Sequence, residues 1–216
     1  MAMVAQVGDL FMVTLHVAAR DGYGCHAVMR AAWGAATPRP FRGLGAHDGR
    51  CLVRGVVRCT ADALADIAET RAVGEIRQRV EVLAVEPLAM HACASVHAMP
   101  VVRRASDRRG QRRGAEVDAW QARREPTQDR RTCYVEWLRS ATLRACGEAP
   151  VSADVTSWGG VEVVRRRQAD DARLSLWRSE LLGVVQLSSQ EAMHRLVDRG
   201  IGRHRAFGFG LVDPQP

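Results

Sequence analysis

The chain has 216 residues and a mass of 23.7 kDa, enough for one large domain or two small ones. The composition, with 47% hydrophobic and 25% charged residues, is that of an ordinary soluble globular protein and excludes a mainly disordered chain, and no apolar run is long enough to cross a bilayer. We expect a cytoplasmic protein with no signal peptide and no membrane partner. The formal net charge is +7, and because lysine is absent, arginine supplies all 31 basic residues; genome composition could explain this bias, but guanidinium groups bind phosphate well, so a polyanion partner is favoured.

The first part of the chain alternates between strand-like and helix-like patterns. Apolar residues recur every second position in the strand segments and at helical spacing in between. The predicted elements are a strand at 9–18, a helix from Asp21 to Gly34, a hairpin through Gly45 and the turn Asp48-Gly49 to Cys59, a short helix capped by Thr60, and a strand at 76–85.

The second part repeats the same order of elements. A capping box at Ser188-Ser189-Gln190-Glu191 is the best helix-start signal in the chain. The predicted elements are a strand at 88–97, a helix at 132–145, strands near 160–167 and 173–187, a helix after Ser188, and a strand at 206–212.

Two βαββαβ units in tandem predict an α+β protein with two ferredoxin-like (RRM-like) domains. Each domain is expected to hold an antiparallel sheet with its helices on one face, so that the other face is open to a ligand. The predicted boundary lies near Glu86-Pro87, which gives an N-terminal domain at 1–86 and a C-terminal domain at 87–216.

Between the predicted strand at 88–97 and the next helix lies an arginine-rich stretch, 103–131. Paired arginines separated by glycine and serine are typical of loops that order on RNA, but a solvated insertion explains the same pattern. We take six of these arginines as candidate RNA contacts: Arg103, Arg104, Arg108, Arg109, Arg112 and Arg113. Arg165, Arg166 and Arg167 form a second basic cluster.

The six cysteines contain no C-x-x-C pair, so neither a zinc ribbon nor a disulfide framework is indicated. His91, Cys93 and His97 would share one face of a strand and are the one group that resembles metal ligands. Packing on a sheet face is the interpretation we favour for them, and we predict no metal and no other cofactor.

In the first predicted helix, Tyr23, His26 and Arg30 form a stripe that points away from the apolar face. A single histidine is more often structural than catalytic. Here a phenol one turn earlier can bond to the imidazole or a phosphate, and a guanidinium one turn later can hold a phosphate. The stripe therefore makes His26 and Tyr23 candidate catalytic residues and Arg30 a candidate RNA contact.

A glycine-rich segment at 200–210 follows the last predicted helix and enters a strand, the reverse of a dinucleotide-binding turn. Gly200 could simply end the helix. Glycines beside basic residues also let backbone amides approach an RNA phosphate, and this is the interpretation we favour. The candidate RNA contacts here are Gly200, Gly202, Arg203, His204, Arg205, Gly208 and Gly210.

These motifs resemble a known family. Gly200-Ile201-Gly202 to Gly208-Phe209-Gly210-Leu211-Val212 resembles the glycine-rich loop of CRISPR-associated repeat-RNA endonucleases, and Asp21-Gly22-Tyr23-Gly24-Cys25-His26 is similar to the catalytic helix of their CasE branch, the processing subunit of the Escherichia-type Cascade complex. Leu182 to Val185 and Glu136 to Arg139 are also similar, so the likeness touches both halves of the chain.

The resemblance implies a metal-independent endoribonuclease that binds the hairpin of a CRISPR repeat transcript, cuts once at its 3′ base and keeps the product within a Cascade-type complex. His26 would be the general acid or base, Tyr23 would orient it or the phosphate, and Arg30 or Arg205 would offset charge on phosphorus. RNA supplies its own 2′-OH nucleophile, so one proton carrier suffices and a 2′,3′-cyclic phosphate results. We expect His26 and the glycine-rich loop to act on one linkage.

The sequence differs from the family pattern at two places. The strand that ends at Pro100 lacks the Arg and the Asn-Pro of relatives, and Ala31 stands near the place where some relatives have a catalytic lysine. Two alternatives therefore stay open. The chain could be a catalytically inactive subunit that binds the crRNA hairpin, or a ferredoxin-like RNA-binding module unrelated to CRISPR.

Overall fold

The computed structural model describes residues 9–19, 21–70, 79–103, 116–123, 128–166, 173–205 and 208–216, without the side chains of 67–70, 162–166 and 173–178. The chain divides into two units. Unit 1 comprises residues 1–89 and 206–208, and unit 2 comprises residues 90–205 and 209–216. Within the described ranges, none of the helices combines the length and apolar character needed to cross a bilayer.

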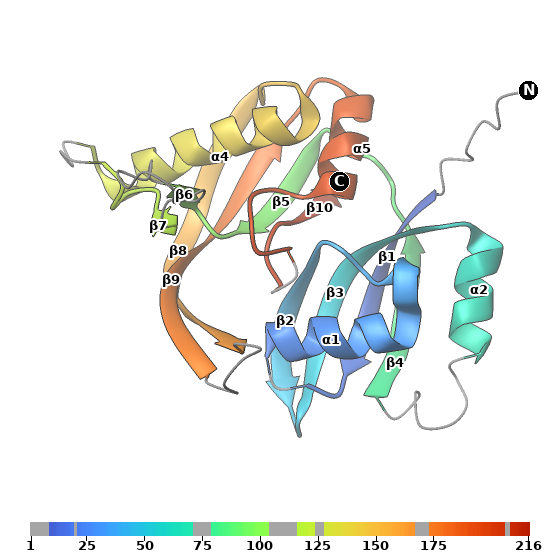
Figure 1. Ribbon diagram of the computed structural model, residues 1–216. Coiled ribbons are helices and arrows are strands. Elements are labelled where there is room, and N and C mark those ends of the chain that lie inside the picture. Colours follow the sequence, from blue (N-terminus) through green and yellow to red (C-terminus); the bar gives the residue numbers. More distant parts are fainter. Residues whose placement is uncertain are drawn as a thin grey trace, which may run out of the picture. The chain divides into compact units, whose positions relative to one another are not determined.

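Unit 1 is a ferredoxin-like fold, as the sequence predicts (Figure 1). Its four strands pair antiparallel in the order β2-β3-β1-β4. The elements in chain order are β1 (Asp9–Val17), α1 (Gly22–Trp33), the 3-10 turn η1 (Gly34–Ala36), β2 (Phe41–His47), β3 (Arg50–Cys59), α2 (Ala61–Thr70) and β4 (Val80–Pro87).

The core of unit 1 lies between the sheet and its helices. Every second residue of β1, from Phe11 to Val17, is buried against Cys25 and Met29 of α1 and Leu64 of α2. Residues directly opposite each other in an antiparallel pair share a face, so the register of β3 against β1 assigns the other residues of β3 to the face away from the helices. That face carries Arg50, Leu52 and Arg54, while Val56 and Arg58 lie beyond the pairing of β3 with β2 and line a cavity that α1 also lines.

Local signals set both ends of α1. Asp21 is the N-cap, and its Oδ1 accepts a hydrogen bond of 2.7 Å from the Gly24 amide. Gly34 follows the last turn with φ 57°, and its amide donates to the Arg30 carbonyl. The predicted bounds of this helix are thus confirmed, and they fix the turn on which His26 lies.

Unit 2 contains a second ferredoxin-like fold, which confirms the predicted fold class. Its main sheet pairs antiparallel in the order β10-β5-β9-β8, and β6 and β7 form a separate two-stranded ribbon (Figure 1). The elements are β5 (Cys93–Ala98), β6 (Val101–Arg103), β7 (Glu116–Asp118), α4 (Arg130–Cys146), β8 (Ser152–Arg166), β9 (Arg173–Gln186), α5 (Gln190–Arg199) and β10 (Leu211–Gln215).

Several strand bounds in unit 2 differ from the prediction. β5 begins at Cys93, later than the expected start at 88. β8 begins at Ser152, well before the expected start near 160, because β9 supplies a pairing partner along its whole length. The last strand begins at Leu211 and continues through Pro214. A proline is tolerated there because β10 is an edge strand, where an amide hydrogen is not needed on the outer side.

The predicted capping box before α5 is wrong by one residue. Ser189 is the N-cap, and its Oγ accepts a hydrogen bond from the Ala192 amide at 3.1 Å. Ser188 instead donates to Glu148 Oε1 at 2.7 Å, and Glu191 pairs with Arg195. A carboxylate distant in sequence thus binds the first serine, and the second serine caps the helix.

The β6-β7 ribbon is fixed to α4 by a buried network. Tyr134 Oη donates to Asp118 Oδ2 at 2.7 Å, and Arg130 Nε donates to Tyr134 Oη at 2.8 Å. Burial raises the pKa of Tyr134 to about 12, so the phenol stays protonated and remains a donor at neutral pH. Asp118 also accepts from the amides of Trp120 and Gln121, which closes the turn after β7.

Candidate functional site

His26 lines a cavity of about 670 Å³ in unit 1. Three arginines, Arg30, Arg39 and Arg58, share the lining, and the remaining lining residues are small or apolar apart from Thr37. None of the described residues in the lining carries a carboxylate. The cavity therefore combines a proton carrier with three arginine side chains, a setting that suits a phosphate group.

The walls of this cavity come from segments far apart in the sequence. The chain after α1 turns back and pairs with β3: the Arg39 amide donates to the Val56 carbonyl at 2.8 Å, and the Val56 amide donates to the Pro40 carbonyl at 3.0 Å. A Cβ at Gly55 would lie 2.8 Å from the Phe41 Cβ, so only glycine allows this close approach. This pairing places Arg39 and the β3 residue Arg58 in one cavity with α1.

The imidazole of His26 is positioned by stacking. Its ring is parallel to that of the buried Phe41, with 6.4 Å between centroids and an interplanar angle of 3°. His26 Nδ1 is buried and has no hydrogen-bond partner in the described part of the chain. The prediction that His26 points away from the core is therefore only partly right, because the ring is half-buried at the edge of the core beside Phe41.

The surroundings of His26 favour its neutral form. Burial lowers the pKa of His26 below its ordinary value of 6.5, and the positive charges of Arg39 and Arg30 lower the pKa further. A lowered pKa moves protonation of the imidazole to more acidic pH. At neutral pH the free protein therefore holds an imidazole that is able to accept a proton.

Replacing Arg39 by glutamine is expected to raise the pKa of His26. The substitution removes the larger of the two charge effects on the imidazole and leaves Arg30 and the burial in place. The imidazole would then take up its proton at a higher pH, closer to 6.5. An NMR titration of the His26 ring protons in the free protein measures the midpoint directly.

Arg58→Gln is the matched control for this titration. Arg58 lines the same cavity but does not contribute to the shift at His26, so its replacement should leave the midpoint close to that of the unmodified protein. Equal midpoints in all three proteins would contradict the assignment of the shift to Arg39.

Tyr23 lies one turn before His26 on α1 and is 38% exposed. It is not among the residues that line the cavity, whereas Arg30 is. The structure thus brings together two members of the predicted stripe, His26 and Arg30, and places the phenol outside the cavity wall. Arg39 and Arg58, which the sequence did not single out, complete the site.

The glycine-rich segment requires glycine at specific positions. Gly200, Gly202, Gly208 and Gly210 all have positive φ, between 67° and 89°. The Ile201 amide donates to the Gly210 carbonyl at 3.0 Å, and the Gly210 amide donates to the His97 carbonyl. These bonds close the segment into a loop between α5 and β10, as the order of the predicted elements implied.

The basic residues of this loop have a carboxylate partner. Glu116 of β7 lies 3.3 Å from Arg203 Nη1 and 2.8 Å from His204 Nε2, and its Oε1 lies 3.6 Å from Arg103 Nη2. The sequence predicts basic side chains beside the backbone amides of the loop, but it does not predict a carboxylate that pairs with them. In the structure, Arg203, His204 and Arg103 instead meet at one glutamate.

Gly208 belongs to unit 1. A Cβ at Gly208 would lie 3.3 Å from Phe41 Cε2, in the ring on which His26 stacks. One glycine of the predicted RNA-binding segment is therefore next to the aromatic ring that positions the imidazole.

Other predicted residues fall outside this site or outside the description. Arg104, Arg108, Arg109, Arg112, Arg113 and Arg167 lie outside the described residues, as do Ala206 and Phe207. Cys93 and His97 share a face of β5, but His91 precedes the strand, so the expected three-residue face is wrong. His97 Nε2 lies 3.0 Å from Glu180 Oε2, and its ring packs on Phe209 with centroids 5.2 Å apart.

The chain has two ferredoxin-like folds, a histidine cavity lined by arginines and a glycine-rich loop. Comparison with known proteins identifies the family to which a protein with these features belongs. The family model described as "CRISPR associated protein" matches residues 15–213, and the chain belongs to this family. No curated protein sequence matches the chain.

Solved structures of similar fold cover nearly the whole chain. A CRISPR endoribonuclease Cse3 bound to 19-nt RNA has a TM-score of 0.59 at 17% identity, covering 96% of this chain and 100% of that one. Thermus thermophilus Cse3, bound to an RNA representing a pre-cleavage complex, has a TM-score of 0.58 at 15% identity (95% and 99%). Cas6e from Escherichia coli K-12 has a TM-score of 0.55 at 13% identity (95% and 100%). The predicted resemblance is thus confirmed in family and fold.

Proposed function

We propose that the protein is a metal-independent endoribonuclease that binds the hairpin of a CRISPR repeat transcript and cleaves it once per repeat. The observation that carries the proposal is the cavity in which His26 lies with Arg30, Arg39 and Arg58. Solved structures of similar fold include an endoribonuclease bound to RNA and a chain of a CRISPR RNA-guided surveillance complex. By analogy, the product stays bound within a Cascade-type complex in the cytoplasm.

The reaction proposed is attack of the ribose 2′-oxygen on the adjacent phosphorus. The 2′-oxygen forms a bond to phosphorus, the bond from phosphorus to the 5′-oxygen breaks, and the products are a 2′,3′-cyclic phosphate and a 5′-hydroxyl. His26 accepts the proton of the 2′-OH, which its lowered pKa favours at neutral pH. The imidazolium that forms is then a donor for the 5′-oxygen.

The arginines have a separate role in this mechanism. The negative charge on the phosphorane oxygens grows in the transition state, and guanidinium groups that line the cavity would bind that charge more strongly than the charge of the ground state. Arg30, Arg39 and Arg58 supply these groups. Tyr23 is assigned to orienting the RNA near the first turn of α1.

Cleavage of a repeat hairpin in EDTA tests the proposal. With protein in excess over RNA, we expect one cut per hairpin and products that carry a 2′,3′-cyclic phosphate and a 5′-hydroxyl. After the cut has been mapped, a single 2′-deoxy nucleotide on the 5′ side of the cut should abolish cleavage, because the nucleophile is missing.

A 2′-deoxy nucleotide two positions away is the control and should leave cleavage unchanged. Cutting of the substrate that lacks the scissile 2′-OH, or a requirement for a divalent metal, would refute the mechanism. Tight binding of the hairpin without cleavage under any condition would instead support the inactive, binding-only subunit.

A further inference from the structure

Phe41, the first residue of β2, is fully buried and is enclosed by residues from three other segments of unit 1. It pairs with Gly55 of β3, where a Cβ would lie 2.8 Å from the Phe41 Cβ, and its ring stacks on the imidazole of His26. Gly208 lies against one edge of the ring, since a Cβ there would be 3.3 Å from Cε2 and 3.9 Å from Cδ2. The same aromatic ring therefore contacts both Gly208 and the imidazole.

Two features make position 208 specific for glycine. Its φ is 89°, in the left-handed region that residues with a side chain rarely adopt. A methyl group there would also come closer to the Phe41 ring than side-chain atoms normally pack, so the ring would have to move by a few tenths of an ångström. A substitution at Gly208 is therefore transmitted to Phe41.

The imidazole of His26 depends on the Phe41 ring for its orientation. Nδ1 of His26 has no hydrogen-bond partner in the described part of the chain, and the neighbouring charges of Arg39 and Arg30 oppose protonation of the imidazole. Parallel aromatic rings with offset centres attract each other, and the 6.4 Å between these two centroids is within the usual range. A displacement of Phe41 should therefore displace the imidazole as well.

We infer that Gly208 and Phe41 are positioning residues for His26: the glycine lets the backbone lie against the Phe41 ring, and the ring holds the imidazole in the orientation for proton transfer. The inference rests on the proposed function for what His26 does, but not for how His26 is held. A proton carrier must be placed to within a fraction of an ångström to act efficiently. Gly208 thus acts through a side chain, in contrast to the backbone contact with RNA that the sequence predicts for it.

Gly208→Ala tests the inference by separating cleavage from binding. With protein in excess over the repeat hairpin, we expect the single-turnover rate to fall about tenfold, the scale for a displacement of a few tenths of an ångström at a proton carrier. The dissociation constant of the hairpin should stay unchanged, because the substitution removes no contact with RNA. A rise in the dissociation constant that accounts for the whole loss of activity would overturn the inference and favour a backbone contact of Gly208 with RNA.

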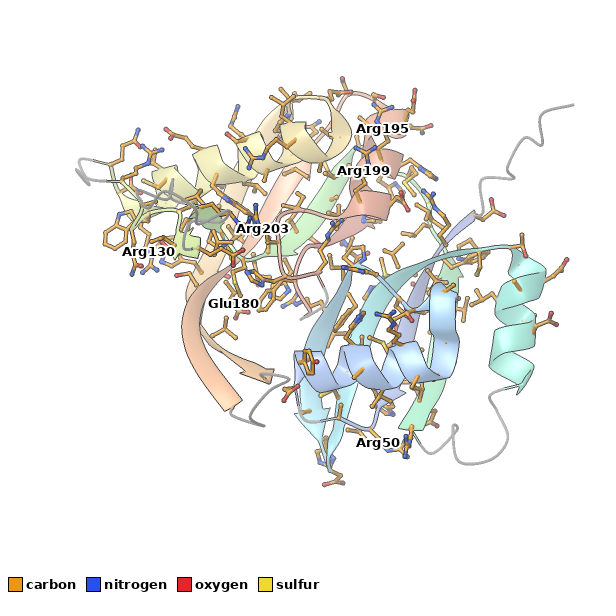
Figure 2. The ribbon with its side chains drawn as sticks, in the orientation of Figure 1. Arg50, Arg130, Glu180, Arg195, Arg199 and Arg203 are labelled. Carbon is orange, nitrogen blue, oxygen red and sulfur yellow. The ribbon has the colours of Figure 1, made fainter. Side chains whose placement is uncertain are left out.

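Gly49→Ala is the matched control. Gly49 also has a left-handed φ, 74°, but a Cβ there would have no atom within 4 Å, so this variant introduces the same kind of backbone strain without touching Phe41. It lies in the turn before Arg50, which Figure 2 shows at the start of β3. Gly49→Ala should lower the melting temperature but keep the full cleavage rate. Equal losses of cleavage in both variants would overturn the inference, because they would reflect lower stability alone.

Combination with His26→Ala provides a second test, because an effect that passes through His26 cannot add to the loss of His26. In the His26→Ala background, Gly208→Ala should leave the residual cleavage rate unchanged, whereas in the unmodified background it should lower the rate about tenfold. Equal fold-changes in the two backgrounds would overturn the inference, because Gly208 would then act independently of the imidazole.

Phe41→Leu is the second variant, since it keeps the position apolar but removes the aromatic face. It should slow cleavage without weakening binding, at temperatures where the protein is still folded. A Phe41→Leu protein that cleaves at the full rate would overturn the inference, because the imidazole would then not need the ring.

The NMR spectrum of the free protein tests the positioning without RNA. The His26 ring stacks on Phe41, so Gly208→Ala should move the chemical shifts of its ring protons and Gly49→Ala should not. Burial is the largest cause of the lowered pKa of His26, so a displaced and more hydrated imidazole should titrate at a higher pH. Unchanged shifts and an unchanged midpoint in Gly208→Ala would overturn the inference even where His26 is catalytic. Moved shifts in a protein that cuts no hairpin would support the positioning of His26 and refute only the proposed function.

Discussion

His26→Ala is expected to slow single-turnover cleavage of the repeat hairpin by about 10² to 10⁴-fold, the usual contribution of one general acid–base group. The substitution removes the proton carrier and leaves Arg30, Arg39 and Arg58 in the cavity. Binding of the RNA should therefore be nearly unchanged. A time course with excess protein, together with an equilibrium binding curve, separates the two quantities.

His194→Ala is the control for this experiment, since His194 lies on α5 and does not line the His26 cavity. It should cleave at the rate of the unmodified protein. The His26→Ala protein should also keep its melting temperature, because the ring is only half-buried. Undiminished cutting by His26→Ala would refute the proposed catalytic role.

The stacking of His26 on Phe41 bears on how such a site is held together. In many proton-transfer sites a carboxylate bonds to the second ring nitrogen and orients the imidazole. Here Nδ1 of His26 has no partner in the described part of the chain, and the flat contact with Phe41 holds the ring instead. Without a nearby carboxylate, nothing offsets the effect of burial and the arginines, so the pKa of His26 stays low.

The fold could be predicted from the sequence because its signals are local. The apolar alternation of β1, the Asp21 cap and the Gly34 stop of α1 each follow from neighbouring residues, and the order of elements repeats in the second half. Strand ends do not follow from local signals where pairing decides them, as in β8, whose first half pairs with β9. The cap of α5 differs from the predicted one because Glu148, distant in sequence, binds Ser188.

The sequence predicts only the part of the site that lies on one helix, α1. Helical periodicity places His26 and Arg30 on the same face, but Arg39 and Arg58 reach the cavity through the pairing of Arg39 and Pro40 with Val56 of β3. No local pattern reports that pairing. The same is true of Glu116, whose contacts with Arg203 and His204 depend on the position of β7 beside the loop.

The glycine-rich loop should be highly sensitive to substitution at Gly210. Its φ is 87°, and a Cβ there would lie 2.4 Å from the Ile201 carbonyl oxygen, far closer than two such atoms approach. Ile201 and Gly210 are also joined by a backbone hydrogen bond, so neither can move without breaking it. Gly210→Ala is therefore expected to destabilise the protein by about 2 to 4 kcal/mol, the sum of left-handed strain and a backbone clash.

Thermal unfolding of the Gly210→Ala protein measures this effect. The Gly159→Ala protein is the control, because Gly159 does not have a backbone conformation that requires glycine. A Cβ at Gly159 would have no atom within 4 Å, and that substitution should change stability by no more than about 0.5 kcal/mol. Because Gly210 closes the loop that carries Arg203 and Arg205, the Gly210→Ala protein should also bind the hairpin more weakly at temperatures where it is still folded. Equal melting temperatures for the two variants would contradict this prediction, because they would show that the loop can rearrange around a side chain at position 210.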